Sequence, residues 1–151
     1  TLDGVRGLSQ MLHPSILDEL GLASTIEWYI KTVERQRGLT VVYDGPSQPL
    51  VVPERVAIHI YRIVQEAVNN AARHSGADRI WIRLQADGTL LVLEVEDHGT
   101  GLKPTNESRG LGLVAMRERA ALMGGQLEFL RPHEGGTLLR LRVRIDSARA
   151  A

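Results

Sequence analysis

The chain has 151 residues, and its 18 Lys and Arg balance its 18 Asp and Glu, so the formal net charge is zero. Hydrophobic residues make up 43% and aromatic residues only 4%, which predicts one domain with an aliphatic core. The balanced charge excludes a general field that would attract nucleic acid or a membrane, and we expect neither as a partner. The absence of cysteine excludes disulfides and thiolate chemistry. No apolar run approaches the roughly 20 residues of a membrane span.

The first half of the chain predicts helices with one strand among them. Pro14 ends a first helical segment, and Gly21 and Gly38 are typical of helix C-termini. Pro53 suits the first turn of a further helix. The expected elements are the end of a helix at 2–12, a helical turn at 15–20, a helix at 22–37, a strand at 39–43 and a helix at 53–75.

The second half changes to a period of two, which is typical of strands with one buried face. Asp87-Gly88 is a strong signal for a two-residue hairpin turn. The expected elements are strands at 80–85 and 91–95, a helix at 110–123, strands at 127–129 and 139–145, and a frayed tail from 146. Helices together with a mostly antiparallel sheet indicate the α+β class, as a two-layer sandwich with the helices on one face.

The helix at 53–75 carries a polar stripe. A spacing of 100° per residue places Arg62, Glu66, Asn70 and Arg73 on one side of it, beside an apolar face, so we expect them at the lip of a cleft. An Asn oxygen suits Mg²⁺ bound to phosphates, a Glu one turn earlier can orient or deprotonate an attacking group, and Arg73 can reach phosphates. The alternative is a solvated helix face, but the adjacent pair Asn69-Asn70 is unfavourable in mid-helix and needs a reason. The apolar face expected to pack on the sheet comprises Val56, Ile60, Val64, Ala67 and Ala71.

Asp97 ends a strand and is followed by Gly99 and Gly101. A carboxylate there can accept a hydrogen bond from the adenine amino group, and the glycines let the backbone approach the ring. The alternative is an ordinary turn after a strand, where Asp and Gly are both common. Thr137, after Gly135-Gly136, could join Asp97 at the adenine, although a plain hairpin turn explains these residues equally well.

The segment Gly110-Leu111-Gly112-Leu113 begins a helix. Free N–H groups and the positive end of the helix dipole can bind phosphate there, and flexible entry into the helix is the alternative. The segment is neither a P-loop, since no Lys follows the glycines, nor a dinucleotide motif, since the third glycine is missing. The polar residues 102–109 stand where a mobile lid could cover phosphates.

These motifs resemble the nucleotide-binding boxes of the ATPase superfamily that unites gyrase, the Hsp90 chaperone, histidine kinases and the MutL mismatch-repair protein. The resemblance is to sensor histidine kinases of the nitrate-sensor-like subfamily in particular, and it covers nearly the whole chain. It rests on Glu66-x-x-x-Asn70, Asp97-x-Gly99-x-Gly101, Gly110-Leu111-Gly112-Leu113, Gly136-Thr137, the segment 12–22 with His13-Pro14, the segment 65–74 that ends in Arg73-His74, and the segment 116–120 before Gly124-Gly125.

The resemblance implies a Bergerat ATP-binding fold that binds ATP with Mg²⁺. It implies Asn70 as the magnesium ligand, Asp97 as the adenine acceptor and the glycines as pocket lining, and it carries Glu66 over as an acid/base or orienting residue. Arg73 and His74 would lie at the pocket, where solvent-facing roles for His74 are as compatible with the sequence.

In such kinases the phosphorylated histidine is followed by an acidic residue on an upstream dimerisation helix. Here only His133 precedes an acid, and its turn context is unsuitable. We therefore expect the cytoplasmic ATP-binding half of a histidine kinase, with residues 1–21 as the stub and linker of a dimerisation helix, 22–146 as the catalytic domain and 147–151 as a tail; the sequence leaves open whether the parent protein is membrane-anchored. Its partners would be its own dimerisation and phosphoacceptor domain, in a homodimer, and a response regulator. The alternatives are a serine kinase of the anti-sigma-factor type and a non-catalytic ATP-binding module.

Overall fold

The computed structural model describes residues 15–47, 50–99, 111–132 and 135–145, except for the side chains of His74, Ser75 and Leu111. In this part of the chain five strands form one sheet in the order β1-β2-β3-β5-β4. Only β1 and β2 pair in parallel, and the other neighbours are antiparallel. The elements are α2 (Ser15–Arg37), β1 (Thr40–Asp44), α3 (Glu54–Asn70), the π-helical turn η1 (Ala71–Ser75), β2 (Arg79–Ala86), β3 (Leu90–Asp97), α4 (Leu111–Leu122), β4 (Gln126–Leu130) and β5 (Thr137–Arg144).

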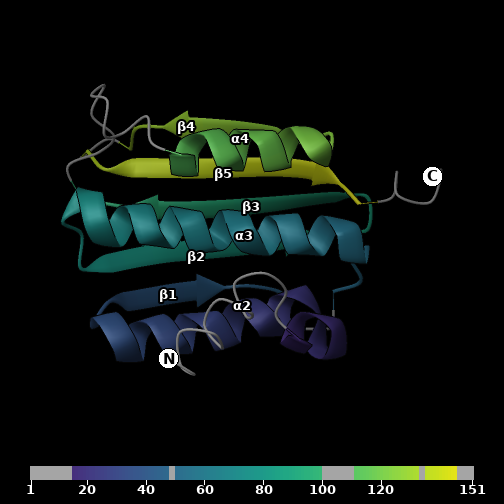
Figure 1. The fold of residues 1–151 in the computed structure, drawn as a ribbon, viewed down its shortest axis with the longest axis horizontal. Helices are drawn as coiled ribbons and strands as arrows, with labels where there is room; N and C mark the ends of the chain where they lie inside the picture. Colours follow the sequence, from purple (N-terminus) through teal and green to yellow (C-terminus); the bar gives the residue numbers. More distant parts are fainter. Residues whose placement is uncertain (1–14, 48–49, 100–110, 133–134, 146–151) are drawn as a thin grey trace.

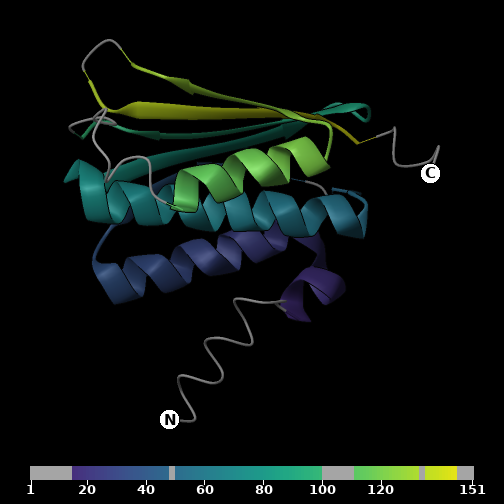
Figure 2. The same ribbon diagram turned by 45° about the horizontal axis from the view of Figure 1, so that its top comes forward.

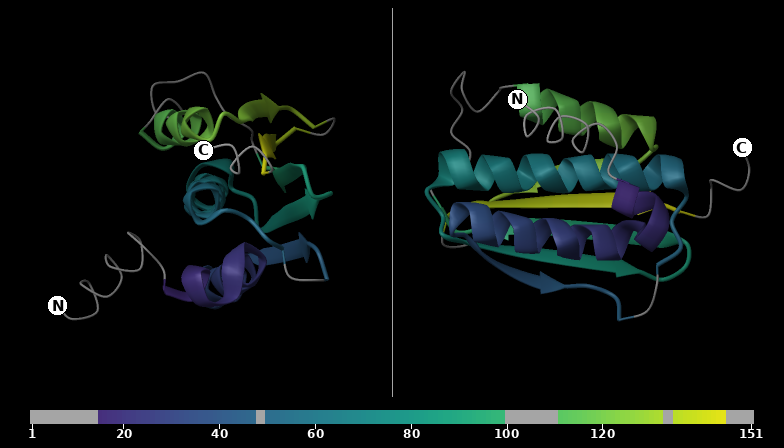
Figure 3. Two further views of the ribbon diagram at one scale, coloured as in Figure 1. Left: turned by 90° about the vertical axis from the view of Figure 1, so that its right-hand side faces the viewer. Right: turned by 60° about the horizontal axis from the view of Figure 1, so that its bottom comes forward.

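The helices form a layer on one face of the sheet (Figure 1, Figure 2). α3 is the middle helix, with α2 on one side and α4 on the other, and the end-on view separates the helix layer from the strands (Figure 3). The expected two-layer α+β architecture with a mostly antiparallel sheet is confirmed. The expected helix end at 2–12, the polar loop 102–109 and the tail from 146 lie outside the described residues.

The core lies between the sheet and α3. Alternate residues of β2, β3 and β5 are almost completely buried, as the period of two predicts. The apolar face of α3 covers them, and the residues expected on that face are all buried. The core residues of these elements include Val56, Ile60, Val64, Ala67, Ala71, Ile80, Ile82, Leu84, Leu91, Leu93, Val95, Leu139, Leu141 and Val143.

The local signals for turns and helix ends act as expected. Gly21 interrupts α2 with a φ of 84° and separates the turn at 15–20 from the longer helix, and Gly38 follows α2 in the left-handed conformation. In the β2–β3 hairpin, Asp87 Oδ1 accepts hydrogen bonds from the N–H groups of Thr89 and Leu90 at 3.0 and 2.9 Å. These bonds fix the turn and therefore the register of the hairpin.

The helix predicted at 53–75 differs from a uniform α-helix at its end. α3 ends at Asn70 and continues as η1, a π-helical turn that Gly76 closes with a φ of 69°. At the end of α3 the N–H of Ala71 is shared between the carbonyls of Ala67 and Val68. Short π-helical turns inside helices occur frequently at functional sites. This turn begins directly after Asn69-Asn70, the pair that an ordinary helix disfavours.

Candidate functional site

Several segments that carry candidate residues meet at one end of the molecule, on the left in Figure 1. β3 ends there and β5 begins opposite it, while α3 passes into η1 and α4 begins. Motifs far apart in the sequence are therefore neighbours in space. The site is built where the edge of the sheet and the ends of two helices converge.

Asp97 is the buried acidic residue of this end, with 7% of its surface exposed. It continues the row of β3 residues that face the helix layer, and its Oδ1 accepts a hydrogen bond of 3.0 Å from the N–H of Gly99. Thr137 lies directly opposite it in the β3–β5 ladder and faces the same layer. The structure thus brings Asp97, Gly99 and Thr137 together. A carboxylate oxygen can accept more than one hydrogen bond, so this position is compatible with a ligand that carries an N–H donor.

Gly136 belongs to the Gly136-Thr137 motif that the sequence offered, where its local pattern was equally compatible with a plain hairpin turn. Its φ is +87°, and a Cβ there would overlap the carbonyl oxygen of Asp97 and lie 2.8 Å from the Cα of His98. Only glycine allows this close approach, because a side chain would push the start of β5 away from the end of β3. The close approach holds the backbone around Asp97 in place. The adjacent Gly-Gly pair was the available signal, but it fits any hairpin equally well.

The start of α4 lies against Glu66 of α3. A Cβ on Gly112 would be 2.5 Å from Glu66 Oε1 and 3.1 Å from its Cδ, so the glycine leaves room for the Glu66 carboxylate in its present position. Leu113 is partly buried against the core and anchors the same turn. The expected neighbours Glu66 and Gly112 therefore meet. A carboxylate lies beside the positive end of a helix, the position in which phosphate oxygens are also stabilised.

Asn70 lies one turn after Glu66 on the same side of α3, between the sheet-facing row and the face towards α4. It is half-buried, and Arg73, within η1, is exposed. Asn69 points differently and lines the groove described below. Gly101 and Gly110 lie outside the described residues, as do the side chains of His74 and Leu111.

A groove of about 500 Å³ runs between α2, α3 and α4 on the side away from the sheet. From the expected polar stripe it includes Arg62, Glu66 and Arg73, whereas Asn70 is not among its lining residues. The sequence did not identify the walls that α2 and α4 contribute. Those residues are Tyr29, Thr32, Val33, Gln36 and Arg37 of α2, and Ala115, Met116 and Arg119 of α4.

Hydrogen bonds between neutral and cationic groups hold the floor of this groove. Arg62 Nη1 donates to Gln65 Oε1 at 2.7 Å, and Gln65 Nε2 donates to the Tyr61 hydroxyl at 3.2 Å. Arg119 Nη1 donates to His59 Nδ1 at 3.1 Å, so the imidazole carries its proton on Nε2. Burial, and then the charge of Arg119, lower the pKa of His59. Burial raises the pKa of Tyr61 to about 12 and lowers the pKa of Arg62.

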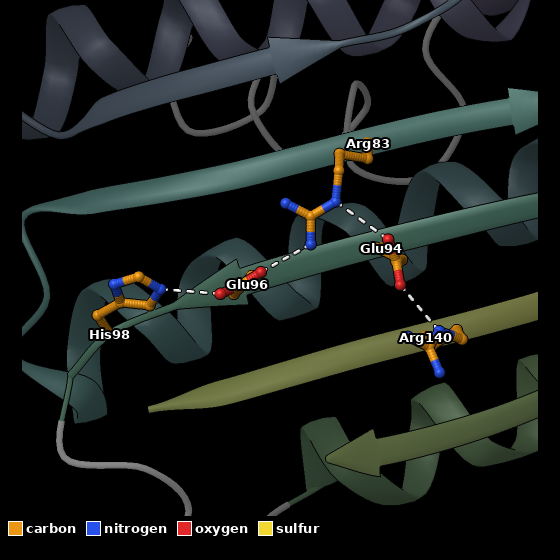
Figure 4. A network of polar contacts seen from close by, with 5 residues as sticks. All are labelled: Arg83, Glu94, Glu96, His98 and Arg140. Atoms are coloured by element: carbon orange, nitrogen blue, oxygen red, sulfur yellow. Dashed lines mark hydrogen bonds and ion pairs between the residues drawn. The ribbon is translucent and has the colours of Figure 1, made fainter. Parts of the chain in front are cut away.

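The opposite face of the sheet anchors the segment that follows Asp97. His98 stacks on Trp81 with ring centroids 4.4 Å apart, and its Nε2 lies 2.8 Å from Glu96 Oε2. Arg83 bonds both Glu96 and Glu94, and Arg140 bonds Glu94 from β5 (Figure 4). His98 therefore points to the outer face and away from Asp97.

The oxygen atoms that the described residues offer here could hold Mg²⁺ only together with a ligand that supplies further oxygen ligands. The described residues contain no group of three or more His, Cys, Asp or Glu that could hold a metal ion. The amide oxygen of Asn70 and the carboxylate of Glu66, one turn apart, are hard oxygen donors of the kind that Mg²⁺ shares with phosphates and water.

Within the described residues, no helix is long and apolar enough to span a membrane.

Comparison with known proteins agrees with this architecture. Residues 55–147 match the family model of histidine kinase-, DNA gyrase B- and HSP90-like ATPases, which is more than half of the chain. The chain belongs to this family, and it is an ATP-binding domain of the histidine kinase type. The resemblance inferred from the sequence motifs is thereby confirmed.

Two curated relatives are histidine kinases by name. The oxygen sensor histidine kinase NreB of Staphylococcus carnosus is 35% identical over 95% of this chain and 42% of its own length. The histidine-protein kinase/phosphatase DegS of Brevibacillus brevis is 33% identical over 92% of this chain and 36% of its own length. The chain thus spans about two fifths of these relatives.

Solved structures share the fold. The histidine kinase domain of the blue-light activated histidine kinase of Erythrobacter litoralis EL346 has a TM-score of 0.77 at 20% identity, over 93% of this chain and 73% of that chain. The ATP-binding domain of PrrB from Mycobacterium tuberculosis has a TM-score of 0.60 at 24% identity, over 76% and 85%.

Proposed function

We propose that this chain transfers the γ-phosphoryl group of Mg-ATP to a histidine on a separate dimerisation and phosphoacceptor domain, which passes it on to a response regulator. The observation that carries the proposal is the convergence of Asp97, Glu66 with Asn70, and the start of α4 at one end of the fold. The curated relatives are named as histidine kinases, which supports the same activity. The domain would act in the cytoplasm, with residues 1–21 as linker, 22–146 as the catalytic unit and 147–151 as a tail.

Adenine recognition would depend on Asp97. Its carboxylate would accept a hydrogen bond from the adenine amino group, with Thr137 beside it and the backbone of Gly99 and Gly101 against the ring. Guanine presents a carbonyl at that position, so acceptor would meet acceptor and GTP would bind much more weakly.

The phosphates would extend from the sheet edge towards α3 and α4. The free N–H groups of the turn 110–113 and the guanidinium of Arg73, with His74 next to it, would neutralise them. Mg²⁺, when bound, would neutralise the negative charge that develops on the phosphate oxygens when the γ-phosphoryl group leaves ADP. Asn70 would hold this ion, and Glu66 would hold its water or orient the attacking imidazole, because its carboxylate lies at the helix start where the terminal phosphate ends.

The test compares two adjacent asparagines. Asn70→Ala should abolish phosphoryl transfer to the acceptor domain supplied in trans and weaken the Mg²⁺-dependent part of ATP binding by about tenfold or more. Asn69→Ala, which changes a groove residue next to it, should retain the Mg²⁺-dependent part of ATP binding within about threefold. Equal loss in both variants, or none in Asn70→Ala, would contradict the role of Asn70.

A second measurement concerns the acceptor. Since none of the histidines has a suitable acceptor context, the isolated chain should acquire no acid-labile label from ATP, although it can hydrolyse ATP slowly. Transfer to an added acceptor domain should give a label that acid removes and alkali does not. Acid-labile label on the isolated chain would show that an acceptor lies within it.

A further inference from the structure

The groove between α2, α3 and α4 extends beyond the residues proposed to hold the nucleotide. Among its described lining residues are four arginines, at 37, 62, 73 and 119, and only one carboxylate, Glu66. His59 beneath it is neutral, since it accepts a hydrogen bond from Arg119. The groove is therefore electropositive although the whole chain has no net charge. Such a concentration of one sign of charge indicates an anionic ligand.

Arg62 and Arg119 are held apart from any carboxylate partner that the structure describes. The contacts that fix them are neutral: Gln65 for Arg62 and His59 for Arg119. Arg62 Nη2 is buried and has no hydrogen-bond partner among the described residues. Burial lowers the pKa of Arg62, and repulsion from the charge of Arg119 lowers it further. Two cations in this arrangement cost folding free energy, and an oxyanion between them would recover it.

The direction of phosphoryl transfer identifies the side from which that oxyanion comes. The acceptor must attack in line, from the side of the terminal phosphate opposite the leaving oxygen. The adenine end lies at the sheet edge by Asp97, and the terminal phosphate would lie where Glu66 meets Gly112. Glu66 also lines the groove, so the groove reaches the residue beside which the terminal phosphate would lie. Arg62 lies one turn before Glu66 on α3, about 6 Å along the helix axis.

We propose that this groove binds an acidic segment of the phosphoacceptor protein, with Arg62 and Arg119 on its carboxylate. The proposal rests on the proposed function and specifies its protein substrate: a segment whose acidic side chain enters the groove while its histidine reaches the phosphate. The volume suits one or two side chains, so the rest of the segment would lie across the rims formed by α2 and α4. Arg62 and Arg119 are positioning residues in this arrangement, because they orient the acceptor and do not touch the transferred group.

The experiment measures transfer to the acceptor domain of the parent protein as a function of acceptor concentration, at saturating ATP. Arg119→Gln should raise the KM for the acceptor about tenfold, with kcat and the Kd for ATP unchanged within about twofold. Arg119→Lys keeps the charge but not the planar guanidinium, so its acceptor KM should be only about threefold above that of the wild type. Arg55→Gln changes an exposed arginine of α3 outside the groove and should behave as wild type.

Ionic strength provides a readout that a merely structural role would not move. The acceptor KM of the wild type should rise with salt, and this rise should be smaller in Arg119→Gln. If the acceptor KM of Arg119→Gln equals that of the control Arg55→Gln, the proposal is overturned. A loss that appears in the Kd for ATP instead would overturn it as well, because the groove would then hold the nucleotide's own phosphate.

Direct binding separates this proposal from the proposed function. Calorimetry of the acceptor domain with the wild type and with Arg119→Gln, both saturated with ADP and Mg²⁺, requires no phosphoryl transfer. Weaker binding to Arg119→Gln supports the groove even if the wild type transfers nothing, in which case only the proposed function fails. Equal binding, or none to either protein, overturns the groove as the acceptor's site.

Discussion

Glu96 and Asp97 are adjacent carboxylates on one strand, and the sheet gives them opposite environments. Asp97 faces the helix layer, where it is 7% exposed and lies opposite Thr137. Glu96 faces outwards, where Arg83 bonds it at 2.7 Å and His98 at 2.8 Å (Figure 4). Burial opposes the ionisation of Glu96, but the hydrogen bonds from Arg83 and His98 outweigh it and lower its pKa.

The difference shows that successive residues at the end of β3 point alternately to the helix layer, where the site lies, and to the outer face of the sheet. Val95 fills the core, Glu96 joins the outer network, Asp97 enters the site, and His98 stacks on the outer face. The period of two assigns each residue to its face, so a slip of one residue would exchange all of them. The outer network therefore has a consequence for the inner face: it holds the register and the segment that carries Asp97.

The largest expected effect separates the two carboxylates directly. Asp97→Ala should weaken ATP binding about 100-fold or more, because a buried charge-assisted hydrogen bond to the ligand is lost. Glu96→Gln should change the affinity by less than about threefold, since its side chain lies on the other face. Calorimetry with ATP, alongside circular dichroism to confirm folding, measures both. Similar losses in the two variants would mean that Asp97 acts through the fold and not through adenine.

The next prediction concerns the backbone contact behind Asp97. Gly136→Ala combines a positive φ with overlap against the Asp97 carbonyl, so it should lower the free energy of unfolding by about 2 to 4 kcal/mol and weaken ATP binding as well. Gly88→Ala is the matched control, with a φ of +104° and no atom within 4 Å of an added Cβ. It should cost only about 1 kcal/mol and leave ATP affinity unchanged. Urea unfolding with ATP calorimetry distinguishes strain alone from loss of the site.

Much of the fold was predictable because its local signals agree with one another. The alternation in β2, β3 and β5, the Asp87-Gly88 turn and the glycines at 21 and 38 each specify a local structure that the packed fold retains. The convergence of Asp97, Glu66 and Gly112 could also be anticipated, because recognisable motifs mark those segments.

The rest depends on contacts between segments that no local pattern encodes. The π-helical turn after Asn70 requires a change of hydrogen-bond pitch that propensities do not predict. Arg119 and Arg37 resemble ordinary exposed helix residues until the packing of α2, α3 and α4 places them around one groove. The demand for glycine at 136 arises from the close approach of the backbone before β5 to the end of β3. Such features follow only from tertiary structure.

A smaller effect is expected where the outer face meets the site. His98→Ala removes the stack on Trp81 and the contact with Glu96, so the backbone after Asp97 should be less well fixed. We expect ATP affinity to fall about threefold, with GTP still excluded, because Asp97 itself remains. His98→Phe keeps the stack and should recover most of the affinity. Fluorescence of Trp81, in a background where Trp28 is replaced by Phe, reports the stack independently of nucleotide. If His98→Ala alters the Trp81 fluorescence but leaves the affinity for ATP unchanged, the stack on the outer face does not influence the nucleotide site, and the prediction is wrong.

The smallest effect is a pH-dependent contribution of the outer network to stability. Glu94 accepts hydrogen bonds from Arg83 at 3.0 Å and Arg140 at 2.8 Å, and these contacts outweigh burial and lower its pKa. A carboxyl group whose pKa is lower in the folded state stabilises the protein above its unfolded pKa of about 4.3, and this stabilisation disappears as the pH falls through the folded value. Glu94→Gln should therefore reduce the free energy of unfolding by about 0.5 to 1 kcal/mol at pH 7 and by almost nothing at about pH 3. Glu128→Gln, which removes a more exposed pair with Arg142, should cost less at pH 7. Urea unfolding of the wild type and the two variants across this pH range measures the difference. If Glu94→Gln still lowers the free energy of unfolding at acid pH, the side chain acts by packing between the strands and not by its charge.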